Sequence, residues 1–404
     1  LIDIASKNPK KVVSILVKEE TIVDIAEGYV DPGKNDVLYN LNEYTVLPGL
    51  MDMHVHLSGE LNPNLYIEKF TLNLDDYAYR SISCAERTLM SGFTTVRDLG
   101  GPVNTSLRNA INKKLLVGPR IFSAGRPIST TGGHGDPTNG IKFGLLEKSI
   151  YENGAVNGVS ESRKAVRTRY KKGADLIKIT ATGEVLSVTK NGENPQFKND
   201  EIVAIVETAS DYQMHVAAQA HGAEGIKRAI KAGVRSIEHG TFMDEEAIGL
   251  MIEKGTFYVP TLSAAKLVTE KAKTDGYYPD IVQQKATNLS PRTIETFKSA
   301  YKAGVKIAFG TDSGVSAHGE NAKEFKYMVD AGMKPIEAIQ SATIVSARLL
   351  NIEKNLGTIE INKKADLIAV RGNPLENIST LEKVFFVMKN GVVYKDIKKE
   401  VFYE

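Results

Sequence analysis

The chain has 404 residues, of which 42% are hydrophobic and 25% charged, and its formal net charge is +2. This length suits one large domain with a smaller unit beside it. The near-neutral charge gives no basic surface for nucleic acid or an anionic membrane, and no apolar run is long enough to predict a spanning helix. The single cysteine, Cys84, excludes an internal disulfide framework.

The sequence begins at Leu1 instead of methionine, directly in strand-like sequence. We expect a cytoplasmic protein. A leader peptide, and with it a periplasmic or secreted location, stays open because the true start is not visible.

Both ends of the chain are rich in short β-like runs separated by turns. Near the beginning these runs are 12–17 and 21–25, and near the end they are 365–370, 384–387 and 392–394. We predict that residues 1–46 and 353–404 combine into one small β-sandwich domain. The domain between them would then span 47–352.

The central part alternates short apolar runs with helical segments. Eight runs with helical crossovers over about 260 residues predict the α/β class and a (β/α)8 TIM barrel. No glycine-rich dinucleotide-binding turn follows the first run. The eight runs are 50–57, 93–96, 120–124, 176–180, 216–220, 234–237, 256–259 and 305–309.

Histidines and an aspartate follow several of these runs. His54 and His56 end the first one, and residues two apart in a strand point to the same face. Their imidazoles therefore project together, as metal ligands do. The fifth run ends at His221, the sixth at His239 and the eighth at Asp312. Because reactive groups sit at the C-terminal ends of barrel strands, this pattern predicts a metal site.

Two further polar residues lie in the apolar runs. Lys178 is inside the fourth run, where an inward-facing lysine of a closed barrel needs a partner or must lose its charge. Lysines more often reach past a sheet edge to water. Gln219 lies two residues before His221, on the same face of the fifth run.

These residues resemble the metal-dependent amidohydrolase superfamily over nearly the whole chain. Within it, the sequence is most similar to a prolidase-like branch that includes Xaa-Pro dipeptidases and arginine/lysine carboxypeptidases. The resemblance implies hydrolysis of an amide bond in dipeptides or N-acyl amino acids, with two divalent cations that we expect to be zinc. The superfamily motifs lie at 48–56, 177–180, 236–240, 309–314 and 364–368, and the branch motifs at 129–135 and 220–226.

The resemblance also implies roles for individual residues. His54, His56 and Asp312 would bind the more buried cation. Lys178 would react with carbon dioxide to give a carbamate that bridges both cations. His239 and a group on the fifth run would hold the second cation.

The fifth run departs from the family pattern. Relatives often have histidine where this chain has Gln219. The Gln219 amide oxygen can bind a metal, but more weakly than imidazole would bind zinc. Alternatively, His221 takes over as ligand, or the second cation is bound loosely.

The implied mechanism uses water made acidic by a divalent cation. Asp312 would take its proton and deliver it to the leaving amine. His221, where it is not a ligand, would donate a hydrogen bond to the oxyanion. His134, in a glycine-rich loop after the third run, and His318, after the eighth, are predicted to contact the substrate.

Two other functions stay open. One is hydrolysis of a cyclic amide, as in imidazolonepropionase. The other is a barrel relative with impaired catalysis, which Gln219 alone favours. In every case we expect a small-molecule ligand and a homo-oligomer, with no nucleic-acid or membrane partner.

Overall fold

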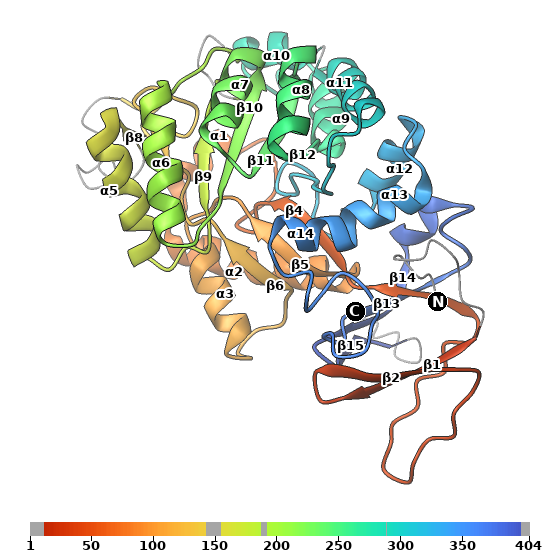
Figure 1. Ribbon diagram of the computed structural model, residues 1–404. Helices are drawn as coiled ribbons and strands as arrows, with labels where there is room; N and C mark the ends of the chain where they lie inside the picture. Colours follow the sequence, from red (N-terminus) through yellow and green to blue (C-terminus); the bar gives the residue numbers. More distant parts are fainter. Residues whose placement is uncertain (1–11, 143–154, 187–191, 288, 397–404) are drawn as a thin grey trace.

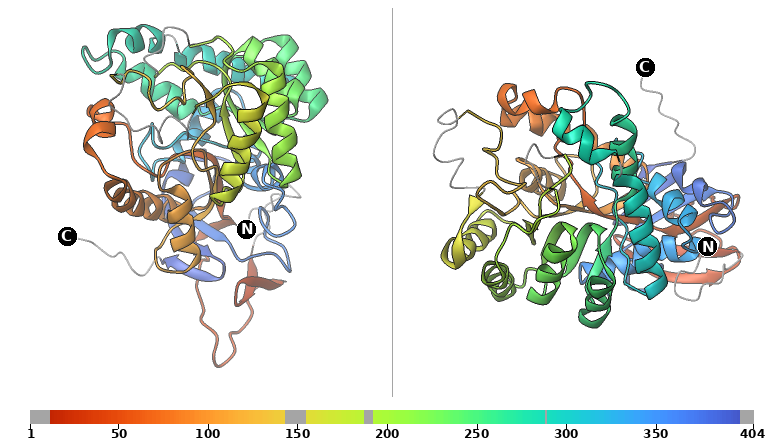
Figure 2. Two further views of the ribbon diagram at one scale, coloured as in Figure 1. Left: turned by 90° about the vertical axis from the view of Figure 1, so that its left-hand side faces the viewer. Right: turned by 90° about the horizontal axis from the view of Figure 1, so that it is seen from above.

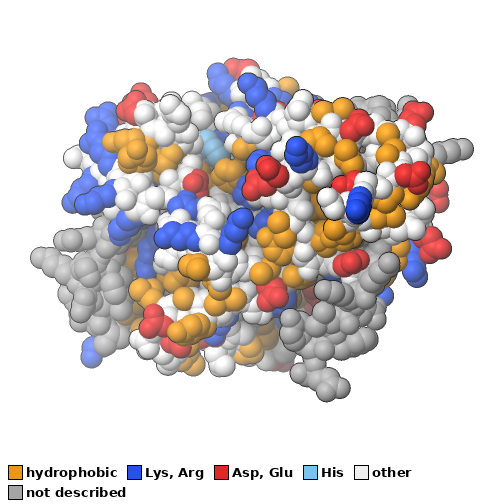
Figure 3. Space-filling model, turned by 90° about the horizontal axis from the view of Figure 1, so that it is seen from below, with side chains coloured by type: hydrophobic (Ala, Val, Ile, Leu, Met, Phe, Trp, Pro, Cys, Tyr) orange, Lys and Arg blue, Asp and Glu red, His pale blue; other side chains and the backbone are white. Residues whose placement is uncertain are grey.

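The computed structural model describes residues 12–142, 155–186, 192–287 and 289–396 (Figure 1). Parallel strands lie at the centre with helices outside them, and strands from both ends of the chain lie together at one side (Figures 1 and 2). No helix among the described residues is long and apolar enough to cross a membrane. Basic, acidic and hydrophobic side chains are interspersed over the face shown in Figure 3, in keeping with the small net charge.

The central strands form two parallel sheets. One has the order β4-β5-β6 and the other β12-β11-β10-β9. Their residues are buried on both faces, as expected for parallel strands covered by helices. The bounds are β4 (Leu50–Val55), β5 (Phe93–Asp98), β6 (Arg120–Ser123), β9 (Ile177–Thr180), β10 (Val216–Gly222), β11 (Ser236–Phe242) and β12 (Phe257–Val259).

The run 305–309, which we predicted as the eighth strand, forms no continuous ladder. It makes a single parallel bridge between Ile307 and Tyr258 on one side. On the other side, the Met53 N–H donates to the Phe309 carbonyl at 2.8 Å. Its hydrogen bonds are thus divided between two neighbours. The α/β class is confirmed, but the described residues show two parallel sheets connected by single bridges in place of a continuous eight-stranded barrel.

The chain ends contribute two antiparallel sheets. A four-stranded sheet has the order β15-β14-β13-β3, and β1 and β2 form a separate hairpin. Apolar residues of both, among them Ile22, Leu367 and Phe386, share one hydrophobic cluster. The predicted β-sandwich is not confirmed, its boundaries stay predictions, and residues 1–11 and 397–404 lie outside the described residues. Bounds are β1 (Val13–Lys18), β2 (Thr21–Glu27), β3 (Tyr44–Pro48), β13 (Leu367–Arg371), β14 (Val384–Lys389) and β15 (Val392–Lys395). The short strands β7 (Ser129–Thr130) and β8 (Ala155–Val156) pair with each other.

The helices around the parallel strands are amphipathic. In α7, for example, Ile226, Ala229 and Ile230 recur at helical spacing and are buried, and the helix packs against β10 and β11. The helices are α1 (Leu65–Thr71), α2 (Leu74–Met90), α3 (Asn104–Asn112), α5 (Gly158–Lys171), α6 (Asn199–Asp211), α7 (Ala223–Ala232), α8 (Glu245–Lys254), α9 (Leu262–Lys271), α10 (Asp280–Ala286), α11 (Leu289–Ala303), α12 (Lys323–Asp330), α13 (Pro335–Gln340) and α14 (Ser346–Leu349). A π-helical turn, η1 (Ser341–Val345), joins α13 to α14, and η2 (Ile378–Glu382) is a 3-10 helix.

Candidate metal centre and active site

The first group of metal-type side chains comes from β4 and the turn after 305–309. The Nε2 atoms of His54 and His56 each lie 3.4 Å from Oδ1 of Asp312. His54 Nε2 is buried and has no hydrogen-bond partner among the described residues. The structure thus brings together the three residues that the sequence predicted to share one cation.

Hydrogen bonds on the other ring nitrogens fix these two histidines. His54 Nδ1 lies 3.0 Å from Oε2 of Glu238, and His56 Nδ1 lies 2.7 Å from the Gly100 carbonyl. Such contacts, in which Nδ1–H donates to an oxygen, leave Nε2 as the ligand atom. Both imidazoles therefore present Nε2 toward Asp312.

Glu238 and Arg97 form a fully buried ion pair beneath the site. Arg97 Nη2 donates to Glu238 Oε1 at 2.7 Å, and Arg97 Nε donates to the Met53 carbonyl at 2.7 Å. Glu238 was not predicted from the sequence. A charged residue between the apolar run 234–237 and His239 could have indicated a role in the site. Arg97 adjoins Asp98 in the chain, but its ion-pair partner is Glu238.

The second group contains Glu184, His221 and His239, whose ligand atoms all lie within 4.8 Å of one another. The two imidazole rings are stacked, with centroids 4.9 Å apart and planes 6° apart. His221 Nδ1 lies 2.9 Å from the Thr241 hydroxyl, and His239 Nδ1 lies 2.7 Å from the Thr261 hydroxyl. These contacts again leave Nε2 as the inward-facing atom.

Glu184 lies in the loop after β9 and was not predicted from the sequence. Its Oε2 is 2.6 Å from His221 Nε2 and also accepts a hydrogen bond from the Gln219 amide. Gln219, the departure from the family pattern, therefore contacts a carboxylate. No pattern of short spacing marks a loop residue of this kind.

Lys178 on β9 is paired with Ala217 on the neighbouring strand β10, two residues before Gln219. It is 1% exposed. Burial lowers the pKa of Lys178 to about 8, although the nearby carboxylates of Glu238 and Asp312 partly oppose this shift. A substantial fraction of the amine is then neutral near pH 7 to 8, which is the form that reacts with carbon dioxide.

Three histidines of the site, His54, His56 and His239, are neutral at pH 7. Burial lowers the pKa of His56 to about 4 and the pKa values of His54 and His239 well below their ordinary value. Neutral imidazole is the form that binds metal. Burial also raises the pKa of Asp312 well above its ordinary value, and the Lys178 charge opposes that rise.

Two residues of the site have strained backbone conformations. His239 has φ of 67° and Asp312 has φ of 56°. Non-glycine residues at positive φ are uncommon and cluster at functional sites, where the surrounding structure enforces them. The strain is direct structural evidence that these two side chains are held in place.

The two predicted substrate-contact histidines differ. His134 is partly buried, and its ring Nδ1 has no hydrogen-bond partner among the described residues. Its backbone N–H donates to Oε1 of the Gln196 side chain at 3.0 Å. His318 is 2% exposed, and its ring contacts the Thr88 hydroxyl at 3.3 Å and the His56 carbonyl at 3.1 Å. Because both ring nitrogens are engaged, we correct the prediction for His318 and assign it to holding the loop after β4.

A pocket beside the second group is lined by equal numbers of polar and apolar residues. Its polar members are Glu184, His221, His239 and Asp312, together with three threonines. Helices α9 and α11 and the loops before and after them supply most of the wall. The apolar residues are Leu186, Pro260, Ala264, Ala265, Val268, Leu289 and Val315.

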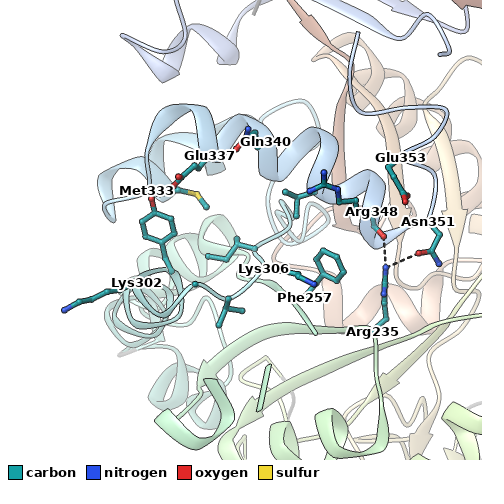
Figure 4. Close-up of a pocket in the computed structure, with 15 residues that line it drawn as sticks. Arg235, Phe257, Lys302, Lys306, Met333, Glu337, Gln340, Arg348, Asn351 and Glu353 are labelled. Atoms are coloured by element: carbon teal, nitrogen blue, oxygen red, sulfur yellow. Dashed lines mark hydrogen bonds between the residues drawn. The ribbon is translucent and has the colours of Figure 1, made fainter. Parts of the chain in front are cut away.

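A larger cavity of about 770 Å³ lies at the opposite, amino-terminal ends of β11 and β12 (Figure 4). Arg235, which precedes β11, donates to the Arg348 carbonyl at 2.7 Å and to Asn351 at 3.0 Å, and lies over the Phe257 ring. This cavity contains none of the clustered histidines, so size alone does not identify the site.

The donor set fits divalent metal ions. It offers imidazole nitrogens and carboxylate oxygens, the ligands that zinc takes, with one buried nitrogen left without a protein partner. His54, His56 and Asp312 form one set and Glu184, His221 and His239 another, with Lys178 nearby. The pairing of two such sets is characteristic of a hydrolytic centre.

Comparison with known proteins agrees with the fold and the site. The model of the amidohydrolase family matches residues 45–399, and the chain therefore belongs to the amidohydrolase family. This confirms the family expected from the sequence motifs, and membership makes the protein a hydrolase.

Individual relatives support the prolidase-like branch. A Xaa-Pro dipeptidase with methionine bound in its active site superposes with a TM-score of 0.92 at 54% identity, covering 95% of both chains. A prolidase complexed with N-methylphosphonate-L-proline gives a TM-score of 0.89 at 34% identity, covering 98% of this chain and 97% of the prolidase. Ochratoxinase from Aspergillus niger is 34% identical over 370 residues, which are 87% of this chain and 75% of that protein.

Proposed function

We propose that the protein is a metal-dependent hydrolase that cleaves the amide bond of dipeptides or N-acyl amino acids with an apolar side chain. The observation that carries this proposal is the meeting of two metal-type ligand sets beside a pocket that has an apolar wall. Similarity to a Xaa-Pro dipeptidase and a prolidase supports peptide-like substrates.

His54, His56 and Asp312 would hold one divalent cation, and His239 with its neighbours would hold a second; we propose zinc for both. When bound, the cations supply Lewis acidity and lower the pKa of bound water from about 15.7 to about 7. Lys178 would be carbamylated: its neutral amine bonds to the carbon of carbon dioxide, one proton leaves, and an anionic carbamate remains. This reaction converts a buried cation into an anion that suits a cation site.

Asp312 would act as general base and then as general acid. Its carboxylate accepts a proton from the attacking water and delivers it to the nitrogen of the leaving amine. Its strained backbone keeps it beside His54 and His56.

His134 would donate to an oxygen of the substrate, because its Nδ1 is buried and has no hydrogen-bond partner in the part of the chain that the structure describes. His221, the donor that the resemblance implied where it is not a ligand, contacts Glu184 through Nε2 within the second ligand group, so His134 is the donor that we propose. A donor aimed at the oxygen that becomes negative stabilises the transition state.

The apolar wall supports a neutral side chain on the substrate. Of its members, Val268 and Leu289 are buried and belong to α9 and α11. The carboxylates of the pocket, Glu184 and Asp312, both contact histidines. A cationic side chain on the substrate would therefore lose its hydration on binding without gaining an ion pair to a free carboxylate. This argues against the activity of an arginine/lysine carboxypeptidase.

The test is a substrate panel with zinc-loaded protein and a bicarbonate supplement. Met-Pro, Leu-Pro and N-acetylmethionine should be cleaved, while Arg-Pro, Lys-Pro and N-acetylarginine should be cleaved at least ~10-fold more slowly. Cleavage of hydantoin or dihydrouracil in preference to every dipeptide would instead establish the cyclic amide function. Zinc-loaded protein that cleaves nothing in the panel would contradict the proposal.

A further inference from the structure

We propose that Glu184 is a ligand of the second cation and replaces the strand-five ligand that Gln219 does not provide. Gln219 then serves to orient the Glu184 carboxylate. This inference rests on the proposed metal-dependent function and assigns roles to Gln219, at which this chain departs from the family pattern, and to Glu184, which Gln219 contacts.

The position of Glu184 carries the first step. Its side chain is 11% exposed, and its carboxylate joins the Nε2 atoms of His221 and His239 within one 4.8 Å group. A buried carboxylate needs a cationic partner or full hydrogen bonding. A divalent cation between the carboxylate and the two imidazoles would meet that need, and carboxylate oxygen is an ordinary zinc ligand.

The contacts of Gln219 carry the second step. Its side-chain amide donates to Glu184 Oε2, so its NH2 group is turned toward the carboxylate. An NH2 group repels a cation, whereas a carboxylate attracts one. In metal sites, hydrogen bonds of this kind hold a carboxylate ligand in orientation.

The backbone around Glu184 carries the third step. The Val185 N–H donates to Glu184 Oε1 at 2.7 Å, and Lys285 Nζ donates to the Glu184 carbonyl at 3.0 Å. The carboxylate is therefore anchored through one oxygen, and the other faces the histidines. A loop residue fixed in this way is preorganised for a ligand and is not merely nearby.

The rival role for Glu184 is contact with the free α-ammonium group of a dipeptide. A carboxylate in the lining of the pocket would also recognise that group. The presence of His239 in the same 4.8 Å group favours the metal role, because a neutral imidazole bonded at Nδ1 presents a lone pair that suits a metal ion.

The two roles separate in a metal titration without substrate. Chelator-treated protein is titrated with Co²⁺ and with Zn²⁺ by calorimetry, and Co²⁺ is also followed by its visible absorption spectrum. The variants are Glu184→Gln, Gln219→His and the double variant, with Glu224→Gln on the exposed surface of α7 as the matched control. The tighter cation, held by His54, His56 and Asp312, reports that each variant is folded.

We expect wild type and Glu224→Gln to bind two cations per chain. Glu184→Gln should bind the second one about 10- to 100-fold more weakly, with the first unchanged and an altered Co²⁺ spectrum. The double variant should recover most of the lost affinity, because a histidine at 219 supplies a new ligand.

Unchanged affinity for both cations in Glu184→Gln would overturn the inference. If that variant also showed a raised KM for Met-Pro and an unchanged KM for N-acetylmethionine, the ammonium role would replace it. If wild type bound two cations as described and cleaved no amide, the proposed function would fail while the ligand assignment stood.

Discussion

The two ends of the parallel strands hold polar side chains in opposite ways. At the amino end of β11, Arg235 is bonded to the Arg348 carbonyl and to Asn351, so its donors are used within the protein. At the carboxyl end, His54 Nε2 is buried without a hydrogen-bond partner among the described residues, and His239 has a strained backbone. In barrel-type α/β enzymes, the carboxyl ends carry chemistry and the amino ends stability. Substitutions at the two ends should therefore separate activity from stability.

The largest effect on activity is expected from Asp312→Asn. Asparagine cannot accept the proton that the mechanism assigns to Asp312, so kcat should fall about 10³-fold. Thermal unfolding should change little, because burial disfavours the charged form of Asp312. Initial rates with Met-Pro and a melting curve measure both. A variant that retains a tenth of the wild-type kcat would refute the assigned role.

Glu238→Gln should lower both the metal affinity and the stability of the protein. The substitution weakens the contact that orients His54 and leaves the buried Arg97 without its charged partner. We expect metal affinity to fall about 10- to 100-fold and the free energy of unfolding to fall by about 3 kcal/mol. Metal titration and urea unfolding of the metal-free protein check the two parts separately. Unchanged metal affinity would show that Glu238 serves the fold alone.

Arg235→Ala should lower stability and leave activity nearly unchanged, the opposite of what we expect for Asp312→Asn. It removes hydrogen bonds to Arg348 and Asn351 and a contact with the Phe257 ring, which should cost about 1–2 kcal/mol of unfolding free energy. Because these groups are at the amino end, kcat/KM should stay within about 2-fold of wild type. A large fall in kcat/KM with a normal melting temperature would break the comparison of the two ends.

The smallest effect is a pH dependence of stability from His215, which immediately precedes β10. Burial and, to a lesser extent, the charges of Arg97 and Arg235 lower the pKa of His215 from 6.5 to about 3. The unfolded chain therefore takes up the proton first as the pH falls, so stability present above pH 6.5 is lost toward pH 3. Urea unfolding at pH 6.5 and 4.5 gives the change in unfolding free energy per pH unit. In His215→Asn this change should be smaller than in wild type by up to about 1.4 kcal/mol per pH unit. Equal slopes would contradict the buried, neutral state of His215.

Much of the site could be predicted because its residues follow local patterns. The alternation in His54 and His56, and the positions of His239 and Asp312 after apolar runs, follow from strand geometry alone. Those residues do lie together in the folded chain.

The remainder depended on tertiary contacts. Glu184 reaches the histidines from a loop, and its approach to Gln219 depends on the path of that loop. His318 has a histidine's chemistry but is enclosed by Thr88 and the His56 carbonyl, which no spacing in the sequence indicates. The run 305–309 has strand composition, yet its hydrogen bonds are divided between neighbours and form no ladder.

The left-handed backbone at His239 and Asp312 has an evolutionary consequence. Each such position costs on the order of 1–3 kcal/mol for a residue with a side chain, and glycine avoids most of this cost. A lineage freed from the need to hydrolyse a substrate would gain stability by drifting to glycine at 239 and 312. A histidine and an aspartate at these positions are therefore what selection for chemistry over stability would retain.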